Sequence, residues 1–501
     1  MKKNIFKSIH ILAVLLAFAN ISCKRVIDVA PRLNVDFTTA LNTPANIDAA
    51  LTAVYGGFKS TTLFGRDLLA VPDALADITQ ATNKSGRLVG ENRNNQGSHL
   101  VLWNLSYQLI NEINLIIDAA NTVQATATQK NNWIAEARFL RGLLYFELVK
   151  TYAYIPTAVV AAQDRGGVVL RYIPTKTKDS ASTFAPSRAP INTVYDSIYS
   201  DINNAIALLP SGSYRGAFYA TRAAANSLLS RVALYRGDYP TSISAATAAL
   251  SASSGLAVLS TAGEYVPGWR LQKNPESIFE IRYATLAESV GVNLSLQTTY
   301  TTLVAPGDFC GTGGFGDLVP NTFLLTALGI TPGALPSCPA GGNPIPGIIT
   351  RGADVRAGLY EWGSAGRGAR FIETTKFIGK NFFNVDNVPV FRTPELYLNR
   401  AEASARSGNE AAALADLNII RTNRGLTAST GLTGTALIAE ILRQRMLEYA
   451  FEGHRFFDLK RTGQDIVKSP ATVLFTDIRI LAPIPNADIV GNPNIQQNPG
   501  Y

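Results

Sequence analysis

Apolar residues recur at helical spacing along most of this chain, and one stretch is apolar around most of its circumference. Residues 133–156 read WIAEARFLRGLLYFELVKTYAYIP, a run of strong helix formers that Pro156 ends. At about 100° per residue, large apolar side chains fall on nearly opposite sides, and only a narrow arc carries Glu136, Glu147 and Lys150. Other elements must cover such a helix. We therefore expect it to be the central helix of an all-α layered body.

Other stretches predict amphipathic helices, several of which form pairs. The predicted helices cover residues 45–61, 100–122, 192–209, 221–236, 240–251, 393–407, 410–423 and 436–451. Gly237 and Gly408 stand between consecutive helices, and glycine suits the left-handed position that follows a helix. Aligning the two turns matches small Ser242 with small Ala413, where two helices would cross. This register is typical of tetratricopeptide-like helix pairs, here separated by insertions.

Residues 257–390 differ in kind, because Gly and Pro are frequent and helical periodicity is lost. Short strands are predicted at 277–282 and 371–378, and another at 168–173 in the preceding part. Long insertions on a helical frame usually carry function. We expect an N-terminal helical part (43–256), an irregular ligand-side insertion (257–390) and a C-terminal helical part (391–501). The two helical parts should form one compact body.

Residues 1–22 have the pattern of a lipoprotein signal peptide. Three lysines precede the apolar run Ile9 to Phe18, which is too short to span a bilayer and ends in Ala-Asn-Ile-Ser-Cys. We expect cleavage before Cys23, lipidation of its thiol, and a tether over 23–42 that holds the body to a membrane. The alternative is an ordinary signal peptide with an incidental cysteine.

Cys310 and Cys338 are the two other cysteines. A leader implies an oxidising compartment, in which they could pair and add about 3 to 4 kcal/mol of stability. Two free buried thiols are the alternative. Without nearby histidines they cannot complete a four-ligand zinc site, so we expect no metal.

The net charge of +8 includes three lysines of the leader, and the other basic residues are scattered. No aromatic residues alternate with them in the manner of a nucleic-acid-binding surface. We therefore expect no nucleic-acid partner.

Four stretches carry a family signature. They are AEARFLRGLLYFELVKTY within 133–156, RTPELYLNRAEASARSGNEAAALADLNIIRTNRGL at 392–426, RQRMLEYAFEGHRFFDLKRTG at 443–463, and the ending PIPNADIVGNPNIQQNPGY. Together with Asp28 and the lipobox, which is the lipidation motif that ends at Cys23, they resemble the SusD/RagB-like outer-membrane lipoproteins of Bacteroidetes. The similarity follows the family's order along essentially the whole chain and is weakest in 257–390.

The resemblance implies a mainly α fold of tetratricopeptide-like pairs with a large loop-rich layer. It also implies a surface lipoprotein that captures a nutrient, commonly an oligosaccharide and in some members a peptide. Such a protein sits as a lid over a TonB-dependent SusC-like barrel in the outer membrane. Lys24 and Arg25 stand where many members carry acidic residues that favour display at the cell exterior, which leaves the membrane leaflet open.

The run Glu452 to Arg461 has the residue types of a catalytic site, with His454 and Asp458 one helical turn apart. The resemblance makes it a structural signature instead, pinned by local pairs such as Glu452 with Arg455. Asp73 and Asp77 read as a solvated helix start, and a glycosidase would need two facing carboxylates. The glycine-rich stretch 307–316 lacks the Lys-Ser/Thr ending of a phosphate loop. We therefore expect no catalytic residues and no cofactor.

Ligand capture is the function that fits these observations. Sugar rings stack on aromatic side chains, and the insertion supplies Trp269, Tyr300 and Trp362, with Asp308 and Asp317 nearby in sequence. Aromatic residues are more often packed in a core. Our hypothesis is that at least one of these three rings is a ligand platform. A surface hydrolase on a helical frame and a ligand-free adaptor that gates the barrel are the alternatives.

Overall fold

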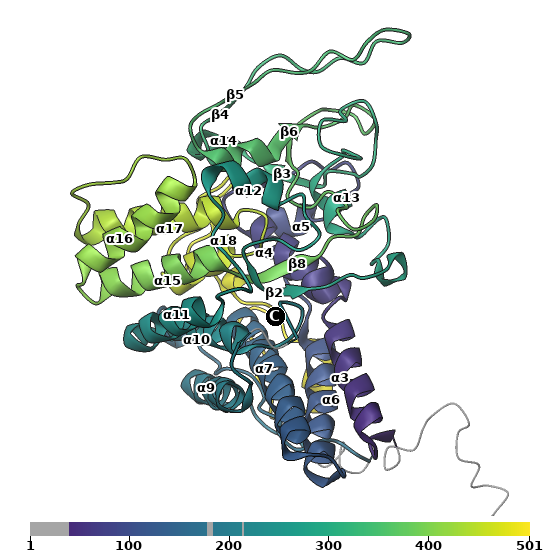
Figure 1. The fold of residues 1–501 in the computed structure, drawn as a ribbon, viewed down its shortest axis with the longest axis vertical. Helices are drawn as coiled ribbons and strands as arrows, with labels where there is room; N and C mark the ends of the chain where they lie inside the picture. Colours follow the sequence, from purple (N-terminus) through teal and green to yellow (C-terminus); the bar gives the residue numbers. More distant parts are fainter. Residues whose placement is uncertain (1–39, 178–183, 213–214) are drawn as a thin grey trace, which may run out of the picture.

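The computed structural model describes residues 40–177, 184–212 and 215–501. The fold is mainly α, as predicted (Figure 1). The predicted signal peptide, the lipidation site at Cys23 and nearly all of the tether lie outside the described residues. Among the residues that are described, no helix combines the length and apolar character needed to cross a bilayer.

Helix α7 (Ala127–Tyr152) is the expected central helix. A capping box between Thr126 and Gln129 starts it, and every side chain from Phe139 to Tyr152 is buried. Its cover comes from α3 (Pro44–Gly57), α6 (Trp103–Thr122), α9 (Ile191–Leu208) and α10 (Arg222–Arg236). The nearly all-round apolar sequence is thus explained by contacts on several sides.

The helix pairs stack side by side although the insertion separates them in sequence. Helix α10 pairs with α11 (Tyr239–Ala252), α15 (Thr393–Arg406) pairs with α16 (Glu410–Asn423), and α11 packs directly on α15. Gly237 and Gly408 both adopt a φ of +81°, as expected for the turns. Ser242 and Ala413 are fully buried at the crossings, which confirms the register. Helices α17 (Gly434–Tyr449) and α18 (Arg455–Arg461) complete this part.

The insertion forms a separate layer that lies over the helices, at the top of Figure 1. Its strands, together with β1 (Thr79–Ala81) of the N-terminal part, make antiparallel two-stranded sheets: β1 with β3 (Leu318–Pro320), β2 (Ser277–Ile281) with β8 (Val388–Arg392), β4 (Ile330–Pro332) with β5 (Ile349–Arg351), and β6 (Tyr360–Trp362) with β7 (Ile372–Thr374). Because β2 pairs with β8, the insertion leaves and rejoins the helical body at one place. Shorter helices are α4 (Asp67–Leu75), α5 (Val89–Asn92), α12 (Ala262–Gly268), α13 (Leu296–Tyr300), α14 (Thr322–Ala327) and α19 (Asn486–Gly491).

The strand predicted at 168–173 is wrong. Tyrosine hydroxyls occupy the backbone groups that a partner strand would need: Tyr107 donates to the carbonyl oxygen of Val169 at 2.7 Å. The Tyr145 hydroxyl donates to the carbonyl oxygen of Arg171 and accepts from its N–H group. The apolar pattern therefore reflects an irregular loop that packs on α6 and α7 through buried Val168 and Val169, whereas Tyr172 and Ile173 are exposed.

Asp73 and Asp77 are not a solvated helix start, as the sequence suggested. Asp73 lies inside α4, is fully buried and accepts the N–H group of Gly453 at 3.1 Å. Asp77 forms a two-bond ion pair with Arg455, at 2.7 Å for each bond. The two carboxylates therefore attach α4 to the C-terminal signature, a contact that sequence separation hides.

Glu402 on α15 is part of the buried charge that holds the C-terminal helices. It is fully buried, and both of its oxygens accept from Arg461, at 2.6 and 2.7 Å. Burial acts to raise the pKa of Glu402, but Arg461, with Arg445 and Arg406, lowers it to about 2.

This pKa predicts how Glu402 contributes to stability. Because its folded pKa lies below the ordinary value of 4.5, its contribution is present above pH 4.5 and is lost as the pH falls toward 2. We expect the difference in unfolding free energy between wild type and Glu402→Gln to be largest near pH 7 and to shrink below pH 4.5. Urea unfolding at several pH values measures this difference. A difference that stays constant down to pH 3 would contradict the assignment.

Candidate functional site

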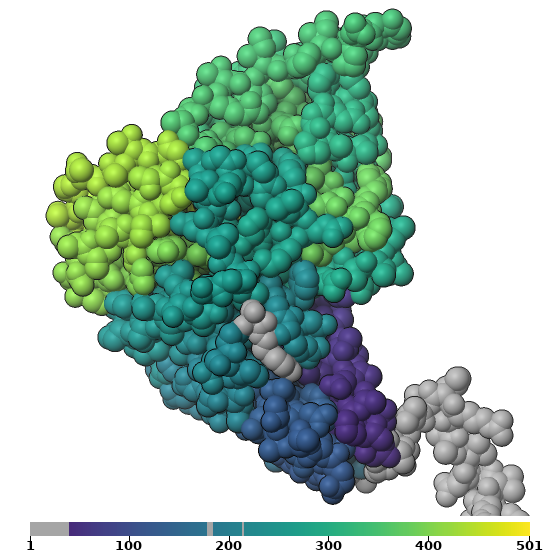
Figure 2. All heavy atoms as spheres, in the orientation of Figure 1, coloured from purple at the N-terminus to yellow at the C-terminus, as the bar shows by residue number. Residues whose placement is uncertain are grey.

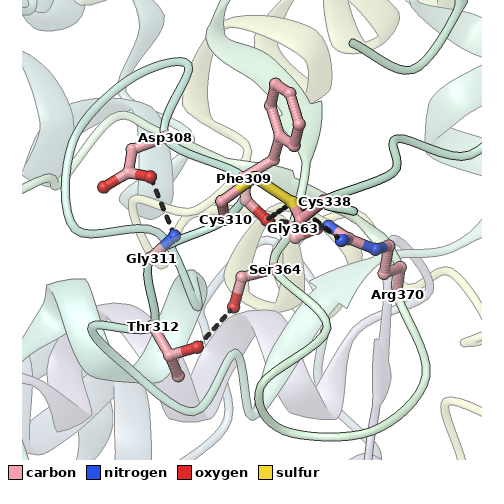
Figure 3. Close-up of a disulfide and its surroundings, with 9 residues drawn as sticks. All are labelled: Asp308, Phe309, Cys310, Gly311, Thr312, Cys338, Gly363, Ser364 and Arg370. Carbon is pink, nitrogen blue, oxygen red and sulfur yellow. Dashed lines mark hydrogen bonds between the residues drawn. A yellow bond between two sulfur atoms is a disulfide. The ribbon is translucent and has the colours of Figure 1, made fainter. Parts of the chain in front are cut away.

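Two of the small sheets bring three loops together on the insertion. Residues 82–87 follow β1, residues 308–317 precede β3, and residues 363–371 connect β6 to β7. The Thr82 hydroxyl donates to the carbonyl oxygen of Gly316 at 2.7 Å, and the hydroxyl oxygens of Thr312 and Ser364 lie 3.1 Å apart. Figure 3 shows the second of these links. The loops therefore form one continuous surface.

We define the Phe315 cluster as Arg87, Phe315, Asp317 and Arg367. The guanidinium carbons of Arg87 and Arg367 lie 4.5 and 4.0 Å from the centre of the half-buried Phe315 ring. Arg87 Nε donates to Asp317 at 2.9 Å, and the Ser85 hydroxyl donates to the other oxygen of that carboxylate. Arg367 is exposed and has no ion pair or hydrogen bond with another described residue. The cluster thus offers an aromatic ring beside unused N–H donors.

Buried charges support the floor of this surface. Burial raises the pKa of Asp317, while Ser85 and Arg87 act in the opposite direction. Burial also lowers the pKa of Lys84, whose Nζ lies 3.6 Å from Oε1 of buried Glu373. Paired charges with low exposure hold loop geometry, so the donors above them need little rearrangement to meet a ligand.

The predicted disulfide between Cys310 and Cys338 is confirmed, with an S–S distance of 1.98 Å (Figure 3). It joins the 308–317 loop to the hairpin between β4 and β5, which projects from the top of the molecule in Figure 2. Arg370 donates to the carbonyl oxygens of Phe309 and Gly363, at 2.9 and 2.6 Å. The cross-link and these bonds fix the edge of the surface that carries the Phe315 cluster.

Two of the three predicted ligand platforms lie in the core. Trp269 and Tyr300 are both fully buried and pack against Phe377. Tyr300 also packs on Phe451. Neither ring has a free face for a sugar, so we correct the interpretation for these two residues. They bury apolar area, the commonest role of a large aromatic side chain.

Trp362 is half-buried and stays a predicted ligand platform. Its indole N–H donates to the carbonyl oxygen of Ile348 at 3.0 Å. A Cβ atom on Gly347 would lie only 2.4 Å from the Trp362 ring, which shows how closely the hairpin backbone packs on it. In this structure Trp362 supports the base of the hairpin.

The Glu452 to Arg461 run is structural, as the sequence indicated, but the expected local pair is wrong. Glu452 binds Lys376 and Arg392 instead of Arg455. His454 is stacked on Tyr449 with ring centres 4.3 Å apart, and burial holds its pKa well below the ordinary value. Within residues 40–177, 184–212 and 215–501, no group of three or more metal-ligating side chains converges.

Sequence reasoning missed Phe315, Arg87 and Arg367. Phe315 is the last residue but one of the glycine-rich stretch 307–316 and stands two positions before Asp317, which the sequence analysis did name. No sequence signal places Arg87 beside it, because their contact depends on the pairing of β1 with β3.

Two family descriptions match the chain. "Starch-binding associating with outer membrane" matches residues 29–234, and "SusD family" matches residues 369–501. SusD-like protein P2 of Formosa agariphila is 29% identical over 205 residues, and the starch-binding protein SusD of Bacteroides thetaiotaomicron is 31% identical over 134 residues. These matches cover 39% and 23% of this chain, and 37% and 22% of the two relatives.

The fold has a match over almost the whole chain. The crystal structure of a SusD superfamily protein from Bacteroides thetaiotaomicron superposes with a TM-score of 0.76 at 25% identity, covering 91% of this chain and all of that one. The two matched family segments contain the central helix α7 and the C-terminal signature with its buried charges. The chain therefore belongs to the SusD/RagB family of Bacteroidetes proteins.

Proposed function

We propose that this protein is a non-enzymatic, lipid-anchored nutrient-binding protein of the outer membrane that captures an oligosaccharide. In this proposal Cys23 carries the lipid, and the protein passes its ligand to a TonB-dependent SusC-like barrel. One observation carries the proposal: the family segments match both helical parts and leave 235–368 unmatched, where Phe315 and the disulfide lie. A constant frame with a divergent surface is the arrangement expected of a family whose members differ in ligand.

The Phe315 cluster supplies the two kinds of contact that a neutral sugar needs. The part of the half-buried ring that the two guanidinium groups leave uncovered offers apolar area for the C–H groups of a pyranose, and the guanidinium group of exposed Arg367 donates to hydroxyl oxygens. The Ser364 and Thr312 hydroxyls lie on the neighbouring loops. Such a surface binds and orients a glycan by stacking and hydrogen bonding.

Replacing Phe315 by alanine is expected to weaken glycan binding about tenfold, because it removes the ring and releases both guanidinium groups from it. A glycan array on the lipid-free protein identifies the ligand, and calorimetric titration measures the affinity of each variant. Phe323→Ala is the matched control, since Phe323 is 51% exposed on α14 and lies outside the cluster. The bound glycan should be recovered intact after incubation. Equal affinity in wild type and Phe315→Ala would reject this site.

A further inference from the structure

A second pocket lies on the helical body and contains no residue of the insertion. Its volume is about 370 Å³, within the range of about 300 to 1,000 Å³ that is usual for small-ligand sites. Its walls come from the first half of α6, the loop 169–175, residues 184–186 and the segment 487–495 around α19. Neither family description nor the Phe315 cluster assigns it a role.

Aromatic side chains form one wall of this pocket. Trp103 and Tyr107 lie on successive turns of α6 with ring centres 4.9 Å apart. Phe184 lies in the pocket wall, is 40% exposed, and has the Arg171 guanidinium 4.4 Å from its ring centre. An exposed aromatic face beside a cavity is a stacking surface for a flat, partly apolar ligand.

Two charged groups in the pocket have no ion-pair partner among the described residues. The Nε atom of Arg171 is buried and has no hydrogen-bond partner in the part of the chain that the structure describes, although its Nη2 donates to the Thr175 hydroxyl. Burial raises the pKa of the Asp488 carboxyl, and the neighbouring Trp103 side chain acts in the opposite direction. An unpaired buried donor needs an explanation, and a ligand acceptor is one.

The amide side chains of the pocket hold its walls in place. Asn111 accepts the N–H group of Thr175 at 2.7 Å, and Asn492 donates to the carbonyl oxygen of Pro186 at 2.8 Å. The first bond fixes the loop at Thr175 to α6, and the second fixes the C-terminal segment to the backbone at Pro186. The pocket is therefore built before any ligand arrives.

We propose that this pocket is a second saccharide site, which takes one or two units of a neutral glycan. One cation and one anion line it, so their formal charges cancel and a neutral ligand is favoured. Sugar hydroxyls donate to Asp488 and accept from Arg171, while the C–H face of the ring covers Phe184. The inference rests on the proposed function, and it adds a second contact that would hold a long glycan more firmly than one site alone.

The test uses the lipid-free protein with Phe315→Ala as background, so that the first site is weakened. Maltotriose, laminaritriose and cellotriose are titrated by calorimetry into wild type, into this background, and into the background with Phe184→Ala or Asp488→Asn. We expect the background to bind about tenfold more weakly at the Phe315 cluster and unchanged at the pocket, and each added substitution to weaken the pocket site about tenfold. Phe383→Ala is the matched control, because Phe383 is 46% exposed outside the pocket, and it should have no effect.

The outcomes separate the two proposals. If wild type binds a trisaccharide and the Phe315→Ala background binds none, the second site is rejected and the proposed function stands. If wild type binds none, the proposed function is rejected together with the second site. A pocket that is filled by trialanine instead of a trisaccharide, with loss in Phe184→Ala and Asp488→Asn, overturns the saccharide assignment.

Discussion

Replacing Gly453 by alanine is expected to lower the free energy of unfolding by about 3 to 5 kcal/mol, through left-handed strain and overpacking together. Gly453 adopts a φ of +78° immediately before the α18 segment. A Cβ atom there would lie 2.2 Å from the carbonyl oxygen of Leu68 and 2.9 Å from the Cα atom of Leu69. Both are backbone atoms of α4, so relief requires the helix to move. That movement would also break the bond from Gly453 to buried Asp73.

Gly408→Ala is the matched control for this change. Gly408 has nearly the same φ of +81°, but a Cβ atom there would meet nothing within 4 Å. Its substitution should cost only the strain of a left-handed alanine, about 1 to 2 kcal/mol. Urea unfolding of both variants gives the comparison. Equal losses of unfolding free energy in the two variants would mean that the close approach of α4 to Gly453 adds nothing to the cost of a left-handed alanine.

Much of the helical body could be predicted from the sequence because its signals are local. The run that is apolar on nearly all sides predicted the central helix, and Gly237 and Gly408 predicted the turns within the helix pairs. Capping also depends on nearby residues: Asp238 accepts the N–H group of Thr241 at the start of α11. Periodicity and capping act within one or two turns, so sequence reasoning reads them directly.

The candidate site could not be predicted to the same extent, because its contacts join distant segments. Arg87 reaches Asp317 across β1 and β3, and Asp77 reaches Arg455 from the other end of the chain. A polar residue that lacks a local partner reads as solvated, although a distant partner buries it. The prediction that Trp269 and Tyr300 bind ligand was wrong for another reason. An irregular segment can still bury its aromatic side chains in a dense core, and both rings are fully buried.

Replacing Glu448 by glutamine is expected to lower the free energy of unfolding by about 3 to 5 kcal/mol, since it leaves buried positive charge uncompensated. Glu448 lies on α17 and is fully buried. Its oxygens accept from Arg392 at 2.8 Å and from Arg424 at 2.8 and 3.1 Å, and Arg356 lies 3.5 Å away. Burial acts to raise its pKa, but Arg424 and Arg392 hold the pKa of Glu448 well below the ordinary value.

The surrounding cluster makes this loss larger than that of an ordinary ion pair. Its four cations and four anions are Arg356, Arg392, Arg424, Lys376, Asp354, Glu276, Glu448 and Glu452. They come from the insertion, from the strands that close it and from the C-terminal helices. A glutamine at 448 keeps the shape but removes one negative charge, so the buried cluster is left with one excess positive charge, although each arginine keeps another carboxylate.

Glu440→Gln, on the same helix, is the control that separates the effect of uncompensated buried charge from the loss of an ion pair near the surface. Glu440 is partly exposed and binds Arg421 and Arg443, so its substitution should cost less than about 1 kcal/mol. Denaturant unfolding of the two variants at pH 7 and 0.15 M salt, repeated at 0.5 M, measures both losses. Salt should shrink the Glu440 effect and leave the Glu448 effect nearly unchanged, because the buried cluster is poorly screened. A Glu448→Gln loss as small as that of Glu440→Gln would show that the cluster does not hold the insertion to the helical body.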